Sequence, residues 1–441
     1  MNSSISLENI NKLAIPALIS GVSEPILSLT DAAIVGNVDF NATEALAAVG
    51  IVTTFMSMLI WVLGQTRSAL ASIISQYLGA NNLSEIKNLP AQVIALMTSF
   101  SLLIVLLSYP FAETVFKFYN ASELILDYCV SYYQIRCFGL PFTLFTIAVF
   151  GTFRGLQNTF HPMLIAMIGT ATNIVLDVLF VYGIDGFIPA MHIEGAAYAS
   201  VIAQILMALA ALYYLLKKTD IPLRIELPIN KEINRFLLMV ANLFVRTLAL
   251  NATLYLGTSF ATAMGKSHIA AYTIGINLWF LGAFIIDGYA GAGGILSGKL
   301  LGAKAYKTLI DLGNRLIVYG LVIGAFLTIV GFVFYYPIGR IFTQEEAVLN
   351  NFYEVFWIVL IMQPVCAVAF IYDSIFKGLG KMKTLRNLLL FATFIVFTPV
   401  LLLLDYCSWE LHGIFTALGV WMLARSFPLI YIFRKSFKPL A

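Results

Sequence analysis

This sequence is poor in charged residues. Lys, Arg, Asp and Glu make up 11% of its 441 residues, against about a quarter in a soluble globular protein. Hydrophobic residues make up 60%, and the mean hydropathy is +0.89. A composition this poor in charge excludes a soluble domain and predicts an all-α protein that crosses a membrane many times.

Several motifs that carry chemistry are also missing. The four cysteines show no CxxC spacing, so neither a metal site nor a disulfide framework is expected. A GxxxxGK[ST] loop, an HExxH pair and a basic patch with interleaved aromatics are absent as well. These absences argue against an ATP-driven pump, an enzyme and a nucleic-acid partner, and no cofactor is predicted. The opening MNSSISLENINKL lacks a basic region and a cleavage site, so the first apolar run is expected to remain as a span.

Twelve apolar segments are close to or above the roughly 20 residues that cross the hydrocarbon core of a bilayer. They cover residues 13–36, 46–76, 89–109, 126–152, 162–183, 195–216, 234–262, 269–297, 311–335, 352–376, 386–404 and 411–433.

The basic residues are divided unequally between the two sets of loops. Of the 26 Lys and Arg residues, 19 fall on one side of the predicted membrane, and only Lys117, Lys266 and Arg340 fall on the other. Because basic loops stay in the cytoplasm, this division predicts a multi-pass protein of the plasma (inner) membrane with both termini cytoplasmic.

The sequence repeats weakly, with one constant offset between the two copies. Tyr77-Leu78-Gly79-Ala80 matches Leu300-Leu301-Gly302-Ala303, and Phe153-Arg154-Gly155-Leu156 matches Phe376-Lys377-Gly378-Leu379. The repeat predicts two pseudo-symmetric six-span lobes, residues 1–216 and 236–441, joined by a polar cytoplasmic linker, 217–235. Two similar lobes around a central cleft are a common design among transporters. Such a chain forms its own cleft, so a monomer is expected.

A stripe of polar and small residues runs along the first span. Ser20, Gly21, Glu24, Ser28 and Asp31 are spaced three or four apart, which places them on one helical face. A charged carboxylate at membrane depth costs roughly 2.5–3.5 kcal/mol on insertion scales. Asp31 and Glu24 are therefore predicted to face a watery cavity and to handle an ion or a proton. The alternative is a protonated carboxyl that only packs against the neighbouring helices.

The fifth span carries a second polar face. It contains Asn173 and Asp177, and Ser200 in the sixth span could add a hydroxyl, unless it only packs helices. If the first and fifth spans are adjacent, Asp31 and Asp177 share a pocket in which two ionised carboxylates would repel each other, as a proton relay requires. A Na⁺ site is an alternative, because carboxylate and amide oxygens are hard ligands. In the second copy of the repeat the matching positions are apolar, so the ion chemistry is assigned to the first lobe alone.

The second lobe carries a different set of candidates. Arg246 lies in the seventh span, Asp287 in the eighth and Asp373 in the tenth. Structural pairing of Arg246 with Asp287 or Asp373 is one interpretation, and coupling of either carboxylate to substrate is the other. Arg136 in the fourth span is expected to reach the membrane surface.

Several segments resemble one family of transporters. PALISGVSEPILSLTDAAIVGNV, NIVLDVLFVYG followed by GAAYAS, and AAYTIGINLWFLGAFIIDGYAGAGGILSGKLLGA are similar to multidrug and toxic-compound extrusion (MATE) proteins, in the branch of DNA-damage-inducible protein F. The resemblance implies two six-helix lobes that form a V-shaped cleft and cation-coupled antiport of amphipathic, often cationic, compounds. It assigns coupling to Asp31, Asn173 and Asp177, with Ser200 where a Thr is common. Glu24 has no counterpart in that pattern.

The prediction is a secondary antiporter that exports amphipathic, cationic organic compounds in exchange for protons by alternating access. Its partners are small molecules and the lipid bilayer. Two alternatives remain open: the same antiport coupled to Na⁺, and a flippase for lipid-linked precursors, against which the excess of carboxylates over arginines inside the spans argues.

Overall fold

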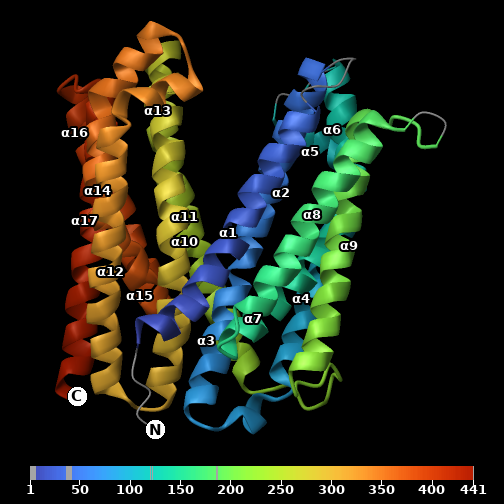
Figure 1. Ribbon diagram of the computed structural model, residues 1–441, viewed down its shortest axis with the longest axis vertical. Coiled ribbons are helices and arrows are strands. Elements are labelled where there is room, and N and C mark those ends of the chain that lie inside the picture. The colour runs from blue at the N-terminus through green and yellow to red at the C-terminus, as the bar shows by residue number, and fades with distance from the viewer. Residues whose placement is uncertain (1–5, 36–41, 120, 122, 185–186, 441) are drawn as a thin grey trace. The chain divides into compact units, whose positions relative to one another are not determined.

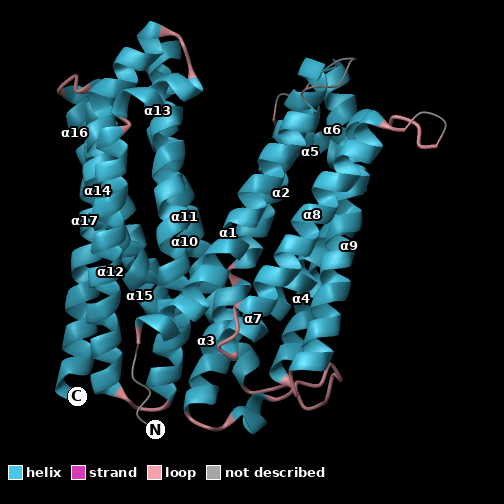
Figure 2. Ribbon diagram, viewed as in Figure 1, coloured by secondary structure: helices cyan, strands magenta, loops and turns pink. Residues whose placement is uncertain are grey.

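The described chain is almost entirely helical. The computed structural model describes residues 6–35, 42–119, 121, 123–184 and 187–440, and within these ranges the side chains of residues 24–29, 32, 33, 42, 43 and 123 lie outside the description. One isolated bridge, Ile184 to Ile188, is the sole β-structure in these ranges. Figure 2 accordingly draws helices and loops but no strand. Helices satisfy their own backbone hydrogen bonds, which is what a chain needs to cross a bilayer.

Eleven helical segments of the described chain are long and apolar enough to span a membrane by length and composition. Helix α1 (Leu7–Val35) is not among them, and some of its side chains are not described. Its 29 residues nevertheless exceed the roughly 20 that are needed to cross the bilayer. With α1 the number reaches the twelve predicted, and the all-α membrane fold is confirmed.

The helices divide into two compact units, one of which holds most of the first half of the chain. It comprises Ile19–Ile74 and Asn82–Leu237. Within it α8 packs on α9, α4 on α7, and α6 on both α2 and α9. Its elements are the later part of α1, α2 (Ala42–Gly64), α3 (Thr66–Gly79) up to Ile74, η1 (Leu83–Ile86), α4 (Leu89–Ser108), α5 (Ala112–Lys117), α6 (Glu123–Arg136), η2 (Cys137–Gly139), α7 (Leu140–Gly155), α8 (Phe160–Tyr182) and α9 (His192–Lys218).

The other unit comprises Leu238–Ala441 together with Met1–Leu18 and Ser75–Asn81. Its centre is α14 (Glu346–Gly378), which packs against α11, α12 and α17. Its other elements are most of α10 (Glu232–Ala263), α11 (Lys266–Gly302), α12 (Tyr306–Val333), α13 (Tyr335–Phe342), α15 (Met382–Leu390), the π-helical η3 (Phe391–Phe397), α16 (Thr398–Tyr406), α17 (Glu410–Phe437) and η4 (Lys438–Leu440) (Figure 1).

The two units do not follow the predicted lobe boundaries residue by residue. The start of α1 lies with the second unit because Ile10, Leu13 and Ala14 join its apolar core. The segment between Lys218 and Glu232 is not helical, and Asn230 in it bonds to Asn88 and Gln92 of the first unit. The functional division into lobes 1–216 and 236–441 around the linker 217–235 stays a prediction.

Candidate functional site

Four predicted polar residues meet inside the first unit. Asp31 comes from α1, Asn173 and Asp177 from α8, and Ser200 from α9. Their exposed fractions are 3%, 0%, 0% and 2%. Asn173 and Asp177 share a face because they are four residues apart, and α8 packs along α9, which brings Ser200 to that face. The sequence predicts this convergence only if the first and fifth spans are neighbours, and they are.

Asn173 is the centre of the cluster. In the orientation that satisfies all of its neighbours, its amide nitrogen donates to Asp31 Oδ1 and to Asp177 Oδ2, at 2.9 Å each. Its amide oxygen then accepts from the hydroxyl of Ser200 at 3.1 Å. Ser200 Oγ also lies 3.5 Å from Asp31 Oδ2. A single amide therefore bridges both carboxylates, and a hydroxyl fixes that amide from the other side.

The orientation of this amide depends on where the protons are. If the amide is turned over, its oxygen faces the two carboxyls and its nitrogen donates to Ser200 at 3.1 Å. An oxygen acceptor is satisfied there only if the carboxyls carry protons, whereas the amide nitrogen suits ionised carboxylates. Asn173 can thus hold the pair in either protonation state, by presenting a donor to the ionised form or an acceptor to the acid form.

Two further residues belong to this cluster, and the sequence interpretation missed their place in it. Arg136, at the end of α6, does not reach the membrane surface as predicted, because it is only 7% exposed and its charge acts on both Asp31 and Asp177. Tyr132, one turn earlier, is fully buried beside the same groups. A signal for this placement exists, because an intramembrane arginine needs a counter-charge, an argument applied to Arg246 but not to Arg136.

A pocket of about 390 Å³ opens in the same unit, nearer the start of α9. It is lined by residues of α2, α6 and α9 and the turn before α9, including Asp127, His192 and Glu194. His192 precedes Ser200 by eight residues, which is about 12 Å along a helix. Asp127 and Glu194 make the lining acidic, which suits a cation.

Of the three candidates in the second unit, Arg246 and Asp373 form an ion pair and Asp287 does not. Arg246 Nη2 donates to Asp373 Oδ1 at 2.5 Å, so the predicted ion pair forms with Asp373. The other partner offered, Asp287, lies on the exposed side of α11 and forms no ion pair among the described residues, so the structure selects Asp373 from the two. Glu24 lies in α1, but its side chain is outside the described residues.

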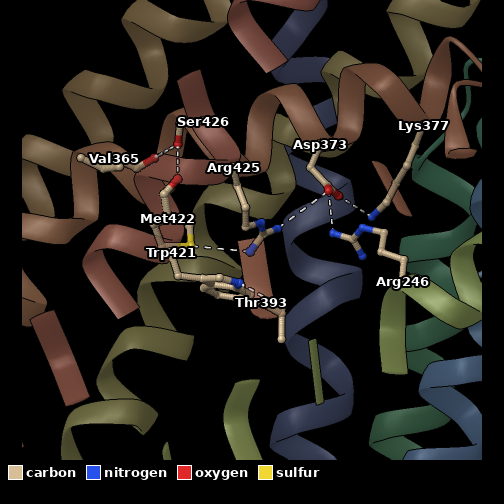
Figure 3. A network of polar contacts seen from close by, with 9 residues as sticks. All are labelled: Arg246, Val365, Asp373, Lys377, Thr393, Trp421, Met422, Arg425 and Ser426. Carbon is tan, nitrogen blue, oxygen red and sulfur yellow. Dashed lines mark hydrogen bonds and ion pairs between the residues drawn. The ribbon is translucent and has the colours of Figure 1, made fainter. Parts of the chain in front are cut away.

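Lys377 and Arg425 join Asp373 in a basic cluster, which Figure 3 shows with Arg246. Lys377 Nζ is 3.0 Å from Asp373 Oδ2, and Arg425 Nη2 is 3.8 Å from Oδ1. No local pattern places Lys377 and Arg425 together, because they lie on different helices, α14 and α17.

The chain matches a family model named MatE over residues 16–179 and 243–403, which together are well over half of its length. The chain belongs to the MatE family. The two matched stretches fall in the first and second halves of the repeat, so both halves carry the family's pattern. Asp31, Asn173 and Asp177 lie within the first stretch, and Arg246 and Asp373 within the second.

Several proteins are similar to this MatE chain. DNA damage-inducible protein F of Escherichia coli strain K12 is 26% identical over 97% of this chain and 92% of its own. The MATE transporter VcmN of Vibrio cholerae, solved in a bent form, has a TM-score of 0.89 at 20% identity, over 98% of this chain and 97% of that one, which shows the fold alone. Protein DETOXIFICATION 42 of Arabidopsis thaliana is 30% identical over 56% of this chain, and the match spans about half, 47%, of that relative.

Proposed function

We propose that this MatE protein exports amphipathic, cationic organic compounds across the plasma (inner) membrane in exchange for protons, by alternating access. One observation carries the proposal: Asn173 bridges Asp31 and Asp177 inside a unit in which all three are buried. Two ionised carboxylates that share one donor at membrane depth repel each other and are poorly solvated. Binding of a proton to either one relieves this repulsion and so lowers the free energy of the unit.

A proton drives transport only if the two conformations bind it with different affinity. Protonation from outside removes the repulsion between Asp31 and Asp177 and lets the Asn173 amide present its oxygen to the acids. This state would favour release of the exported compound. Loss of the proton to the cytoplasm restores the carboxylates and turns the amide nitrogen toward them, and this state would favour uptake of the next molecule.

The choice of proton over Na⁺ rests on Arg136. A Na⁺ ion among Asp31, Asp177 and Asn173 would find hard oxygen ligands. The buried guanidinium of Arg136 already acts on both carboxylates, however, and would repel a second cation. Na⁺ coupling is therefore the alternative and proton coupling the proposal.

The proposed topology follows the distribution of basic residues. We propose that both termini lie in the cytoplasm, and the 19 Lys and Arg residues on one side of the membrane support this orientation. The exported compound and the proton are the only partners proposed besides the lipid bilayer. Transport of this kind needs no covalent chemistry and no second subunit, so we propose a monomer without enzymatic activity.

The test is ethidium efflux from proteoliposomes under an imposed pH gradient, and separately under a Na⁺ gradient. We expect the pH gradient to drive efflux in the wild type, and Asp31→Asn to abolish it while the variant still purifies as a monodisperse protein. Asp405→Asn is the control, because it removes an exposed carboxylate near the end of α16 that has no ion pair among the described residues.

The other outcomes each reject part of the proposal. Full efflux by Asp31→Asn would reject the role of the acid cluster. Efflux driven by Na⁺ alone would keep the antiport and change the ion. No movement of dye under either gradient would favour an exporter of narrow specificity or a flippase for lipid-linked precursors.

A further inference from the structure

We propose that the basic cluster of α10, α14 and α17 is a binding site for a carboxylate group, and that compounds carrying a carboxylate are among those this protein moves. Transport of carboxylate compounds rests on the proposed export function, whereas the existence of the binding site does not. The cluster consists of Arg246, Lys377 and Arg425 around Asp373, all within the second unit (Figure 3).

The charges of this cluster do not balance. Three cations surround one carboxylate, and Asp373 is the only acidic residue of the described chain that forms an ion pair with any of them. The side chains of Arg425, Arg246 and Asp373 are 4%, 7% and 9% exposed, and that of Lys377 is 22% exposed. A buried charge without a partner costs several kcal/mol. Two buried arginines share one buried carboxylate, and the partly exposed Lys377 adds a further positive charge, so the cluster calls for an anion.

Both arginines keep donor capacity that Asp373 does not use. Arg246 Nε is buried and has no hydrogen-bond partner among the described residues. Arg425 is too far from Asp373 for a hydrogen bond, at 3.8 Å, and its Nη1 instead points to the sulfur of Met422 at 3.5 Å, a weak acceptor. A carboxylate is the group that matches the planar fork of a guanidinium, through two parallel hydrogen bonds.

Arg425 is held in place by groups that would not compete for this ligand. Its guanidinium lies 4.6 Å from the centre of the Trp421 ring, a cation–π contact. Trp421 is fixed in turn, because its indole nitrogen donates to Thr393 Oγ1 at 3.2 Å. Thr393 belongs to the π-helical segment η3, an irregularity that occurs often at functional sites. The neighbouring aromatic surface favours an amphipathic or aromatic carboxylate.

The helices of the first half of the repeat lack charges at three of the four equivalent positions. The charges are therefore not needed for the helix packing that the two halves share. In the first copy of the repeat, Arg246, Asp373 and Arg425 correspond to Ser23, Phe150 and Ile202. Only Lys377 has a basic counterpart. The acids of the first unit have no counterparts in the second either, since Leu254 and Val400 occupy their positions.

The two halves thus carry opposite polarity on the same helical scaffold. The carboxylate pair of the first unit suits a proton or a cation. The guanidinium pair of the second unit suits an anionic group by the same electrostatic argument. The predicted substrate class widens accordingly, from organic cations to amphipathic compounds that also carry a carboxylate.

The experiment measures binding without any gradient. The thermal stability of the purified protein in a neutral detergent is followed against sodium benzoate, with sodium chloride at equal ionic strength and neutral benzamide as ligand controls. We expect benzoate alone to raise the melting temperature in a saturable way. Arg425→Gln should weaken the apparent affinity about tenfold to a hundredfold, since hydrogen bonds to a charged group are lost, and Arg340→Gln, at an exposed arginine, should not.

Asp373→Asn separates an anion site from a structural ion pair. If the cluster binds an anion, this variant loses stability but regains it in benzoate, because the ligand replaces the missing carboxylate. If the cluster only packs the helices, the variant is destabilised and benzoate does not restore it. Should Asp373→Asn fail to fold, Arg425→Lys provides the second measurement, since it keeps the charge but loses the fork and should weaken benzoate binding.

The remaining outcomes are equally decisive. Equal stabilisation by benzamide, or unchanged benzoate affinity in Arg425→Gln, would overturn the proposal. Stabilisation by phosphatidylglycerol vesicles, lost in Arg425→Gln but absent with benzoate, would assign the site to a lipid phosphate and reject the substrate carboxylate. Benzoate binding without ethidium efflux would leave this site standing while the proposed antiport fails.

Discussion

Gly79 packs against the helix that contains Gly302, and Gly302 packs in the same way against the helix that contains Gly79. A Cβ atom on Gly79 would overlap the carbonyl oxygen of Lys299, and one on Gly302 would overlap that of Gln76. Gly79 corresponds to Gly302 in the repeat, and Gln76 corresponds to Lys299, so the same contact is made twice. Each segment thus uses the same surface to contact the other. Such a contact is called isologous and is typical of two copies related by a twofold axis. The duplication is therefore visible in the packing of these two segments as well as in the sequence.

Substitution at this contact should destabilise the protein. Gly302→Ala forces a methyl group into the backbone of the neighbouring helix, and overpacking of this kind costs about 1–3 kcal/mol. We expect a lower melting temperature in size-exclusion thermostability measurements. Gly291→Ala, on the same helix but with open space around its Cβ, is the control and should be close to neutral. Equal stability of the two variants would contradict the reciprocal contact.

Removal of the bridging amide should shift the pH dependence of efflux rather than abolish efflux. Asn173→Leu removes both the donor to the ionised carboxylates and the acceptor for their acid form. The hydrogen bonds to the ionised form are the stronger ones because they are charge-assisted, so Asp31 and Asp177 would hold a proton up to a higher pH. We expect the pH of half-maximal ethidium efflux to rise by about one unit or more, since one unit corresponds to about 1.4 kcal/mol. Asn251→Ala, at an exposed position on α10, should leave the profile unchanged. An unaltered profile in Asn173→Leu would show that the amide does not govern proton binding.

Arg136 should determine which ion drives transport. Arg136→Gln removes the buried cation that acts on Asp31 and Asp177. We expect efflux to become stimulated by a Na⁺ gradient, since a second cation would then no longer be repelled. Arg136→Lys keeps the charge and should retain the wild-type ion preference, as should Arg340→Gln. If Arg136→Gln remains insensitive to Na⁺, the preference for protons lies elsewhere.

Cys407 offers a test of topology in the native chain. It is exposed at the end of α16, whereas Cys129, Cys137 and Cys366 are buried. It lies in one of the loops that are poor in basic residues, so we expect a membrane-impermeant maleimide to label it from outside intact cells. Ser84→Cys in a Cys407→Ser background should be labelled only after permeabilisation. Labelling of Ser84→Cys from outside would invert the proposed orientation.

The first-unit site could be predicted in part because its residues are unusual for their surroundings. Asp31 and Asp177 are carboxylates in apolar runs, and helical spacing alone puts Asn173 and Asp177 on one face. The bridge itself could not be predicted, because it depends on how α1, α8 and α9 approach one another. The prediction for Arg136 was wrong, since one helix seen alone does not show whether an arginine turns toward lipid headgroups or toward buried acids.

The second-unit site depended more strongly on tertiary structure. Arg246 called for a partner, but the sequence left Asp287 and Asp373 equally available. Helix packing decided in favour of Asp373, which faces α10, whereas Asp287 lies on the exposed side of α11. Lys377 and Arg425 are far apart in the sequence and on different helices, and only the packing of α14 and α17 brings them to the same carboxylate.

The sequence by itself determined the helical membrane fold, the number of spans, the duplication and the identity of the buried ionisable residues. It could do so because apolar length, helical periodicity and the rarity of charge in a bilayer are local properties of the chain. Only the tertiary structure decided which ionisable residues share a site. It groups two acids with one arginine in the first unit, and three cations with one acid in the second. Those groupings depend on contacts between helices distant in sequence, and such contacts are set by the packing of whole helical faces.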